Sequence, residues 1–415
     1  MVKTAKKTVN WLYGKFSKKP NKTFFNRTYV IDPCINLSNT VFTIYYKKYI
    51  AYLKSIGLIE DAFTKQLAQH DTNYYKKNNI ILRPGECAYD YNAPLLIKSI
   101  HTKPNFVLHY SQFAETRLIN LKCFYSNIIH FDAIDIFQKH KLYFITHEYF
   151  PEICKKYMKP TFYILYTHKY KFDTNYYILR SIYTTRHDDD DMMFITNKKD
   201  LEIALEYYES HLNVLNKRAT YFNNRILASE VMMNPLLHNG RKVSVHMYYL
   251  VTIINFQLKC FLYNEGKIFL AKKQFSKRKR DLTKDVHNTK YEYTQCDLVF
   301  PYDLKNKVAE DSVFQQMKIV LSAVTANVNM IKHYALYNTQ NNGFMLTGVN
   351  FLIDEDYNVF IVNITKQFEV RSYNPRNKLI DKLFNWIRIC ALDPGFKGTD
   401  ASTHPSYIVP YPIKP

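Results

Sequence analysis

Closely spaced cysteines are missing from this sequence. Its seven cysteines form no CxxC pair, which excludes the common zinc-binding spacing and argues against a disulfide framework. The first residues, MVKTAKKTVNWLYGKFSKK, lack the apolar core of a secretory signal, and no apolar run is long enough to span a bilayer. These absences predict an intracellular protein of the cytoplasm or nucleus, with reduced thiols and no transmembrane segment.

Acidic residues and glycine are both in short supply. There are 36 Asp and Glu against 57 Lys and Arg, so the formal net charge is +21. Such a charge favours anionic partners: nucleic acid, an anionic membrane or an acidic protein segment. Only 9 residues are glycine, whereas Lys, Asn, Tyr and Ile are abundant. This composition is typical of AT-rich genomes, such as those of many large DNA viruses, and suggests a virion component.

The positive charge is concentrated in two segments. Residues 1–30 interleave lysines with aromatic side chains, as in segments that lie on nucleic acid or an anionic surface; a solvated tail is the alternative. A second cluster follows residue 271 and is expected in a loop, either solvated or a nuclear-targeting signal. The predicted anion-binding residues are Lys3, Lys6, Lys7, Lys15, Lys18, Lys19, Lys272, Lys273, Lys277, Arg278, Lys279 and Arg280.

Apolar spacing predicts a mixture of helices and strands. Helices are expected at Thr43–Leu67, Leu201–Leu215, Val308–His333 and Lys378–Leu392, and strands at Tyr176–Arg180, Met192–Thr196 and on both sides of Asn255. The predicted organisation is a basic N-terminal arm (1–30), an N-terminal α/β subdomain (31–134), a central subdomain (135–228), a C-terminal subdomain (229–392) and a Pro-rich tail (393–415). The tail, with five prolines, is expected to be extended and able to lie along a partner.

The stretch NGFMLTGVNFLIDEDYNVFIVNIT, residues 342–365, predicts a β-hairpin. Two β-branched runs flank the turn-forming cluster at 354–358. A loop symmetric about Asp356 and Tyr357 places Asn350 opposite Asn363 on one face of the sheet. Burying an amide is costly unless it is paired. The two asparagines are therefore either a mutually satisfied core pair or part of a site.

Four blocks in this chain resemble the tubulin–tyrosine ligase-like family. NPLLHNGRKVSVHMYYLVT at 234–252 is similar to the family's NPLL…GRK block, and the hairpin above is similar to the family's metal-binding segment. TNYYILRS at 174–181 and HNTKY at 287–291 are similar to two further blocks, and all four follow the family's order over residues 135–392. The resemblance implies an ATP-grasp fold: an α+β body with mainly antiparallel sheets, here with extended N- and C-terminal arms.

The family's chemistry activates a carboxylate with ATP and Mg²⁺ for attack by an amine. The resemblance implies that an Asp and a Glu on the hairpin hold the metal, with an Asn beside the Glu. The corresponding positions in this chain are Asn350, Asn363 and Thr365. An amide offers an oxygen dipole but no charge, so these substitutions predict the loss of the Mg²⁺ site.

Other positions at which the family has ATP-binding or catalytic residues are also substituted in this chain. The Asp and Arg that follow GRK in the family correspond to Ser244 and His246, and a Lys that precedes a Pro corresponds to Arg180. The family's Gly-Arg-Gly phosphate loop corresponds to Arg186 followed by His187 and the acidic run Asp188–Asp191. Carboxylates beside a triphosphate repel it. If it is not a degenerate phosphate loop, the acidic run is a solvated loop, a cation site or a mimic of an acidic partner segment.

Together these features predict a catalytically degenerate ligase-like protein, without a metal or other cofactor, that acts in binding or assembly. Both termini would contact protein partners, and the basic surface would contact an anionic polymer. One alternative is an active ATP-dependent amino-acid ligase that modifies an acidic protein tail, in which Arg180, Arg241, Lys242 and Asn363 retain a weak site for ATP and Mg²⁺. A second alternative is a nucleic-acid-binding protein.

Overall fold

The computed structural model describes thirteen segments of the chain. Predictions for most of the N-terminal arm, for residues 186–191 and for residues 287–291 lie outside the described residues. The segments are 28–31, 40–60, 106–108, 124–126, 139–163, 176–181, 193–215, 226–255, 257–278, 298–301, 307–335, 342–365 and 379–412.

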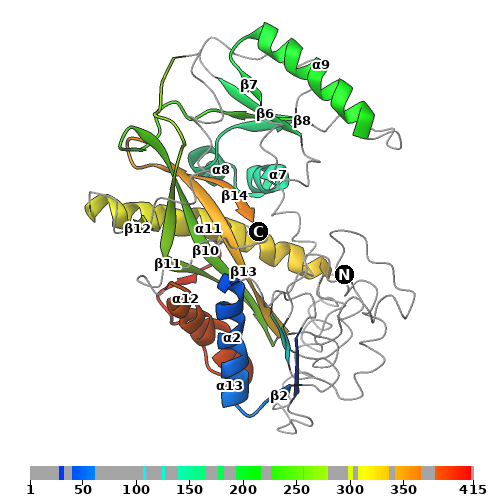
Figure 1. Ribbon diagram of the computed structural model, residues 1–415, viewed down its shortest axis with the longest axis vertical. Helices are drawn as coiled ribbons and strands as arrows, with labels where there is room; N and C mark the ends of the chain where they lie inside the picture. The colour runs from blue at the N-terminus through cyan, green and yellow to red at the C-terminus, as the bar shows by residue number, and fades with distance from the viewer. Residues whose placement is uncertain are drawn as a thin grey trace, which may run out of the picture.

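A large mixed sheet runs through the middle of the molecule (Figure 1). Its strands lie in the order β12-β11-β10-β13-β4-β3-β1-β2, with β14 on β13, β15 on β11 and β9 on β10. The strands β9 to β15 pair antiparallel with one another, whereas β1 to β4 pair parallel and β4 also pairs parallel with β13. The bounds are β1 Thr28–Ile31, β2 Ile59–Glu60, β3 Phe106–Leu108, β4 Phe124–Ser126, β9 Leu237–His238, β10 Arg241–Ile254, β11 Gln257–Leu270, β12 Val299–Phe300, β13 Asn342–Ile353, β14 Val359–Thr365 and β15 Tyr407–Ile408.

The long hairpin of β10 and β11 is the centre of this sheet, as the sequence predicts. Asn255 closes it with φ of 51°, a left-handed conformation that asparagine tolerates better than most residues. Side chains alternate between the two faces of β10. Val245 and Met247 enter one hydrophobic core, and Tyr248 and Leu250 enter the other.

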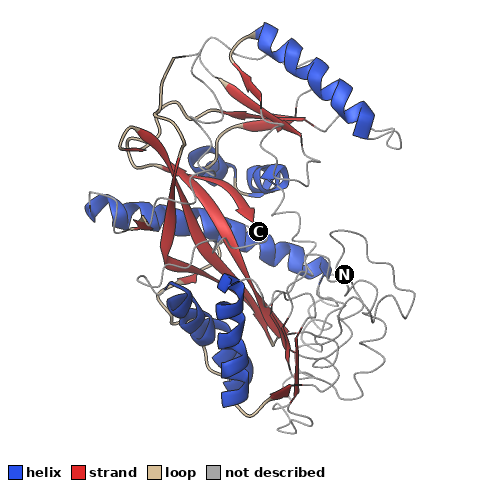
Figure 2. Cartoon of the chain, viewed as in Figure 1, coloured by secondary structure: helices blue, strands red, loops and turns tan. Residues whose placement is uncertain are grey.

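Helices cover both faces of the large sheet (Figure 2). The long helix α11 (Lys307–Ala335) packs on one face together with α7 (Lys139–Tyr149) and α8 (Pro151–Tyr157). The other face is covered, over part of its length, by α2 (Thr40–Ser55), α12 (Leu379–Ile387), a π-helical turn (Arg388–Leu392) and α13 (Asp393–Lys397). The helix predicted at 308–333 is confirmed as α11. Among the described residues, no helix is both long and apolar enough to cross a membrane.

A second, four-stranded antiparallel sheet forms a smaller layer at one end of the molecule. Its order is β5-β8-β6-β7, and α9 (Lys198–Leu215) packs on it through Leu201, Ala204 and Tyr208. Both strands and the helix predicted for 176–215 are confirmed. The bounds are β5 Thr161–Tyr163, β6 Tyr177–Ser181, β7 Met193–Ile195 and β8 Ile226–Glu230.

The grouping of elements differs in detail from the segments expected from the sequence. Helices α7 and α8, which fall within residues 135–228, contribute Leu142 and Cys154 to the core of the large sheet. The same sheet extends beyond β13 through β4, β3 and β1. Of these strands, β3 and β4 lie within the predicted subdomain 31–134, and β1 begins just before it. The helix expected at 43–67 ends at Ser55, because Gly57 adopts φ of 83° and the chain turns into β2.

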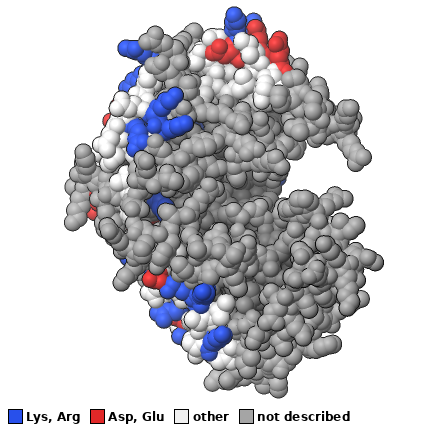
Figure 3. All heavy atoms as spheres, in the orientation of Figure 1, with Lys and Arg blue, Asp and Glu red and all other residues white. Residues whose placement is uncertain are grey.

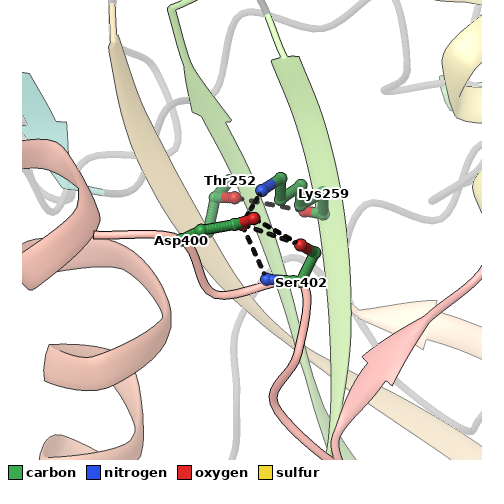
Figure 4. Close-up of polar contacts among 4 residues, drawn as sticks. All are labelled: Thr252, Lys259, Asp400 and Ser402. Carbon is green, nitrogen blue, oxygen red and sulfur yellow. Dashed lines mark hydrogen bonds and ion pairs between the residues drawn. The ribbon is translucent and has the colours of Figure 1, made fainter. Parts of the chain in front are cut away.

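The Pro-rich C-terminal segment, predicted to be extended over 393–415, begins with helix α13 and continues through turns between Ala401 and Tyr407, along the chain's own body. The Leu262 N–H donates to the Ser406 carbonyl, and the Tyr411 N–H donates to the Ser322 carbonyl. Asp400 is joined to Lys259 of β11, 2.5 Å away, and to the N–H and hydroxyl of Ser402 (Figure 4). Residues 393–412 are therefore part of the folded unit.

Candidate functional site

The hairpin of β13 and β14 pairs Asn350 with Asn363, which confirms the predicted register. The hairpin formed by the two strands is not symmetric. Phe351 pairs with Ile361, so Val362 is an extra residue on β14 and forms a β-bulge next to the asparagines. The bulge returns Asn363 to the face of the sheet on which Asn350 lies.

A row of hydrogen-bonded polar side chains crosses three neighbouring strands at this point. His246 of β10 lies directly opposite Asn350 of β13. The Asn350 Nδ2 donates to Asn363 Oδ1 at 2.9 Å, and His246 Nδ1 lies 2.7 Å from Asn350 Oδ1. Because Asn350 Oδ1 can only accept, His246 Nδ1 carries the proton in this bond. The row is held together by direct bonds between uncharged amides and one buried imidazole.

Gly348 makes room for the imidazole. His246 is only 1 % exposed, and a methyl group at Gly348 would clash with its ring and with Thr365 Oγ1. The Thr365 hydroxyl donates to the Gly348 carbonyl at 3.2 Å. His246 and Thr365 thus meet at this glycine, next to the bonded pair of Asn350 and Asn363.

The turn of the hairpin is held from outside the sheet. Asp354 Oδ1 accepts the N–H groups of Asp356 and Asn358, at 3.0 and 2.8 Å. Gln316 of α11 donates to the Tyr357 carbonyl and accepts the Val359 N–H. Asp354 is 5 % exposed and occupied in this turn, so it does not replace a carboxylate at position 350.

Cations lie on the same face of the sheet, beyond the polar row. Lys242 and Ser244 share the face of His246 because residues two apart on a strand point the same way. Lys242 is 3 % exposed. Burial, followed by the positive charges of Arg180 and Lys159, lowers the pKa of its amine to about 7. Lys159 Nζ lies 4.3 Å from the ring centre of Phe360 on β14, within cation–π range.

The structure brings together most, but not all, of the residues expected from the sequence. Lys242, Ser244, His246, Asn350, Asn363 and Thr365 share one sheet face, and Arg180 approaches Lys242 from the small sheet. Arg241 is the neighbour of Lys242 on β10 and points to the opposite face. Lys159 was missed, since nothing in its local sequence distinguishes it from other surface lysines.

The basic cluster after β11 forms a separate exposed loop, as predicted. Lys272, Lys273, Lys277 and Arg278 are exposed, and the Phe275 N–H donates to the Gly240 carbonyl, which ties the loop to the turn before β10. Figure 3 shows Lys and Arg side chains along the rim of the described surface, with acidic side chains near the end where α9 lies. Arg186, Lys279, Arg280 and the lysines of the N-terminal arm lie outside the described residues.

Mg²⁺ does not fit the polar row. A hard divalent cation requires carboxylate or other anionic oxygen ligands, whereas positions 350 and 363 present amides that already bond each other. Within the described part of the chain, no group of three or more His, Cys, Asp or Glu side chains could hold a metal ion.

A large, mixed sheet next to a smaller antiparallel one is the arrangement of the ATP-grasp class. The chain is similar to the C-terminal domain of K. lactis Pby1, an ATP-grasp enzyme that interacts with the mRNA decapping enzyme Dcp2. The TM-score is 0.58 at 15% sequence identity, and the match covers 94% of this chain and 99% of that one.

Within this class, the family is given by the sequence. The profile of the tubulin-tyrosine ligase family matches residues 166–386, which is more than half of the chain. The protein belongs to that family. A comparison with curated proteins gives no significant match.

Proposed function

We propose that this protein is a catalytically degenerate member of the tubulin-tyrosine ligase family that acts by binding, as a structural or assembly component. The observation that carries the proposal is the closed row of His246, Asn350 and Asn363 at the family's metal position. Amide and imidazole side chains that bond one another bring no carboxylate charge to attract Mg²⁺.

Ligation by this family's chemistry has requirements that the row does not meet. The transferred phosphoryl group develops charge that the metal neutralises. The family's strand arginine corresponds to His246, whose Nδ1 is committed to Asn350 and whose ring is enclosed by Gly348 and Thr365. The acidic run Asp188–Asp191, where the family has a glycine-rich phosphate loop, supports the same interpretation.

The direct test is calorimetric titration of the protein with Mg-ATP and, separately, with Mg²⁺. We expect no Mg²⁺-dependent gain in ATP affinity and no ATP-dependent transfer of an amino acid to acidic peptides. The double substitution Asn350→Asp with Asn363→Glu should create measurable Mg²⁺ affinity, while Asn350→Gln with Asn363→Gln serves as the uncharged control. Ligation by the unmodified protein would establish the alternative, an active amino-acid ligase.

A binding role has two candidate surfaces. The exposed loop with Lys272, Lys273, Lys277 and Arg278 suits an anionic polymer, either nucleic acid or an acidic protein segment. A protein partner is supported by the similar Pby1 domain, an ATP-grasp enzyme that interacts with another protein. The amino-acid composition, which is typical of AT-rich genomes, supports a role in the particle of a large DNA virus. The protein would then be in the cytoplasm or nucleus before assembly.

Polymer binding is tested by filter binding or anisotropy at increasing salt. Neutralising all four loop cations should reduce the slope of log affinity against log salt by up to about four, because fewer counterions are released. A slope that the substitutions leave unchanged would assign polymer binding to another surface.

A further inference from the structure

Exposed apolar side chains gather where the C-terminal segment lies on α11. Among the described residues, seven large apolar side chains are exposed, and four of them belong to this region. They are Tyr149 of α7, Ile319 of α11, and Val409 and Tyr411 of the C-terminal segment, and together they are called the apolar strip. Val409 is 70 % exposed and Tyr149 is 52 % exposed. Apolar residues exposed singly need no explanation, whereas a contiguous group indicates a contact surface.

Two hydrogen bonds fix the C-terminal segment to α11. The Lys318 ammonium donates to the Pro405 carbonyl at 3.1 Å, and the Tyr411 N–H donates to the Ser322 carbonyl at 3.0 Å. Residues 405–411 are therefore held against one turn of the helix at both ends.

The members of the apolar strip lie at or between these two points. Val409 lies between them on the C-terminal segment, and Ile319 lies between them on α11. The Tyr411 ring meets the Phe150 ring edge-on, with ring centres 5.5 Å apart. Tyr149 precedes Phe150 at the end of α7. The strip therefore runs from α11 along the C-terminal segment to the junction of α7 and α8.

The strip is already ordered in the single chain. Pro410 and Pro412 flank Tyr411 and restrict the backbone on both sides of it. The Tyr411 backbone is bonded to α11, and its ring rests against Phe150. A surface that is ordered beforehand loses little conformational entropy on association, so more of the free energy of apolar burial is retained as affinity.

The two ends of the strip carry opposite charges. Lys318 lies beside Ile319 at one end. Glu148 and Glu152 lie on either side of Tyr149 in the sequence at the other end, and both are exposed. In a pair of copies related by a two-fold axis through the middle of the strip, Lys318 of each copy would lie near the acidic end of the other. This complementarity offsets part of the repulsion between two chains of net charge +21.

An acidic partner is the alternative that the net charge of the chain favours. The charges beside the strip are of both signs, however, because Lys155 and Lys156 follow one turn after Glu152 on α8. A surface without a field of one sign gives an acidic partner no advantage there, whereas a surface with opposite charges at its two ends is complementary to itself.

We propose that the apolar strip is the contact between two copies of this chain, which pair about a two-fold axis. Ile319 and Val409 would lie at the apolar centre of the contact, with the charges at its rim. The inference goes beyond the proposed function and does not depend on whether the family's site is degenerate. A dimer would also present two copies of the basic loop after β11, which suits an assembly component that binds an anionic polymer.

The test is sedimentation velocity of the full chain at protein concentrations from about 1 to 100 µM. Salt of about 0.3 M reduces the general repulsion between the basic chains. We expect a monomer–dimer equilibrium. Ile319→Glu and Val409→Glu should each raise the dissociation constant at least about tenfold, because each places a charge at the apolar centre twice in a symmetric contact. Ile203→Glu, at a similarly exposed isoleucine of α9, is the matched control and should change nothing.

An exchange of charges tests the two-fold arrangement itself. Lys318→Glu alone, and Glu148→Lys with Glu152→Lys, should each weaken the dimer several-fold, because like charges then meet at the rim. All three substitutions together should restore the dimer, since the charges at the two ends are opposite again. A contact with a different partner would show no such rescue.

The proposal is overturned by a chain that stays monomeric over the whole range, by a dimer that neither apolar substitution weakens, or by a triple variant that remains monomeric. A monomer that co-sediments with phosphatidylserine vesicles, and loses this on Ile319→Glu, would assign the strip to a membrane surface instead. If Val409→Glu fails to fold, as judged by circular dichroism, Ile319→Glu on the exposed face of α11 decides alone. Failure here is separate from failure of the proposed function, because ligation is measured with Mg-ATP and a monomer or a dimer says nothing about it.

Discussion

His246 and Asn350 face each other across β10 and β13, joined by a 2.7 Å hydrogen bond in which the imidazole Nδ1 donates. The substitution Asn350→Leu would leave His246 Nδ1 and Asn363 Oδ1 without this partner in a place where little water can replace it. We expect a loss of about 1–3 kcal/mol in the free energy of unfolding, measured by urea denaturation. His238→Leu is the control, since His238 is on the short strand β9 and should cost much less. A loss no larger than the control would contradict a structural role for the row.

Gln316 of α11 should stabilise the turn between β13 and β14 through its two direct hydrogen bonds. Gln316→Ala removes its bonds to the Tyr357 carbonyl and the Val359 N–H, at an expected cost of about 1–2 kcal/mol. Hydrogen exchange should accelerate at Val359 and along β14. Gln315→Ala, at an exposed neighbour on α11, is the matched control and should leave both measurements unchanged.

The sequence predicts which residues lie at the site more accurately than it predicts the local backbone geometry. Alternating β-branched residues define β13 and β14, and a symmetric turn predicts Asn350 opposite Asn363, a pairing that the chain reaches only through the bulge at Val362. The bulge at Val362 has no glycine or proline to mark it, because it is enforced by the packing of Val359, Ile361 and Ile364 on the core. Lys159 was missed for a related reason, since its role depends on how α8 and the small sheet are placed against β14.

The described cysteines should be chemically inert in the folded protein. Burial raises the pKa of the Cys154 and Cys260 thiols to about 11 and that of Cys390 to about 12. At pH 8 these thiols are therefore almost entirely protonated and poor nucleophiles. Brief alkylation with iodoacetamide followed by mass spectrometry should leave all three unmodified in the native state and modify them after denaturation. Native labelling at Cys260 would contradict its burial between Tyr249 and the core.

Lys242 should make the stability of the protein depend on pH. Its pKa is about 7 in the folded state and about 10.5 when unfolded, so the unfolded state binds more protons between these values. The contribution of Lys242 to stability therefore increases as pH rises from 7 to 10.5. Lys242→Met should stabilise the protein at pH 6, and the gain should shrink steadily towards pH 10. Thermal denaturation at a series of pH values measures this, with Lys272→Met as the control, and a gain that does not vary with pH would contradict a buried amine.

The C-terminal segment should stabilise the body on which it lies. Ile408 is 1 % exposed and pairs with Cys260 on β11, and the Trp386 indole donates to the Ser406 hydroxyl at 2.8 Å. Removing residues 400–415 would expose this edge of β11 and leave the buried indole N–H without its acceptor. We expect the melting temperature to fall measurably, by about 1 °C for each kcal/mol lost in a chain of this size. Removing only residues 413–415 is the control. An arm that serves only a partner would predict no change in melting temperature for either truncation, and the contacts of residues 400–412 predict a difference between them.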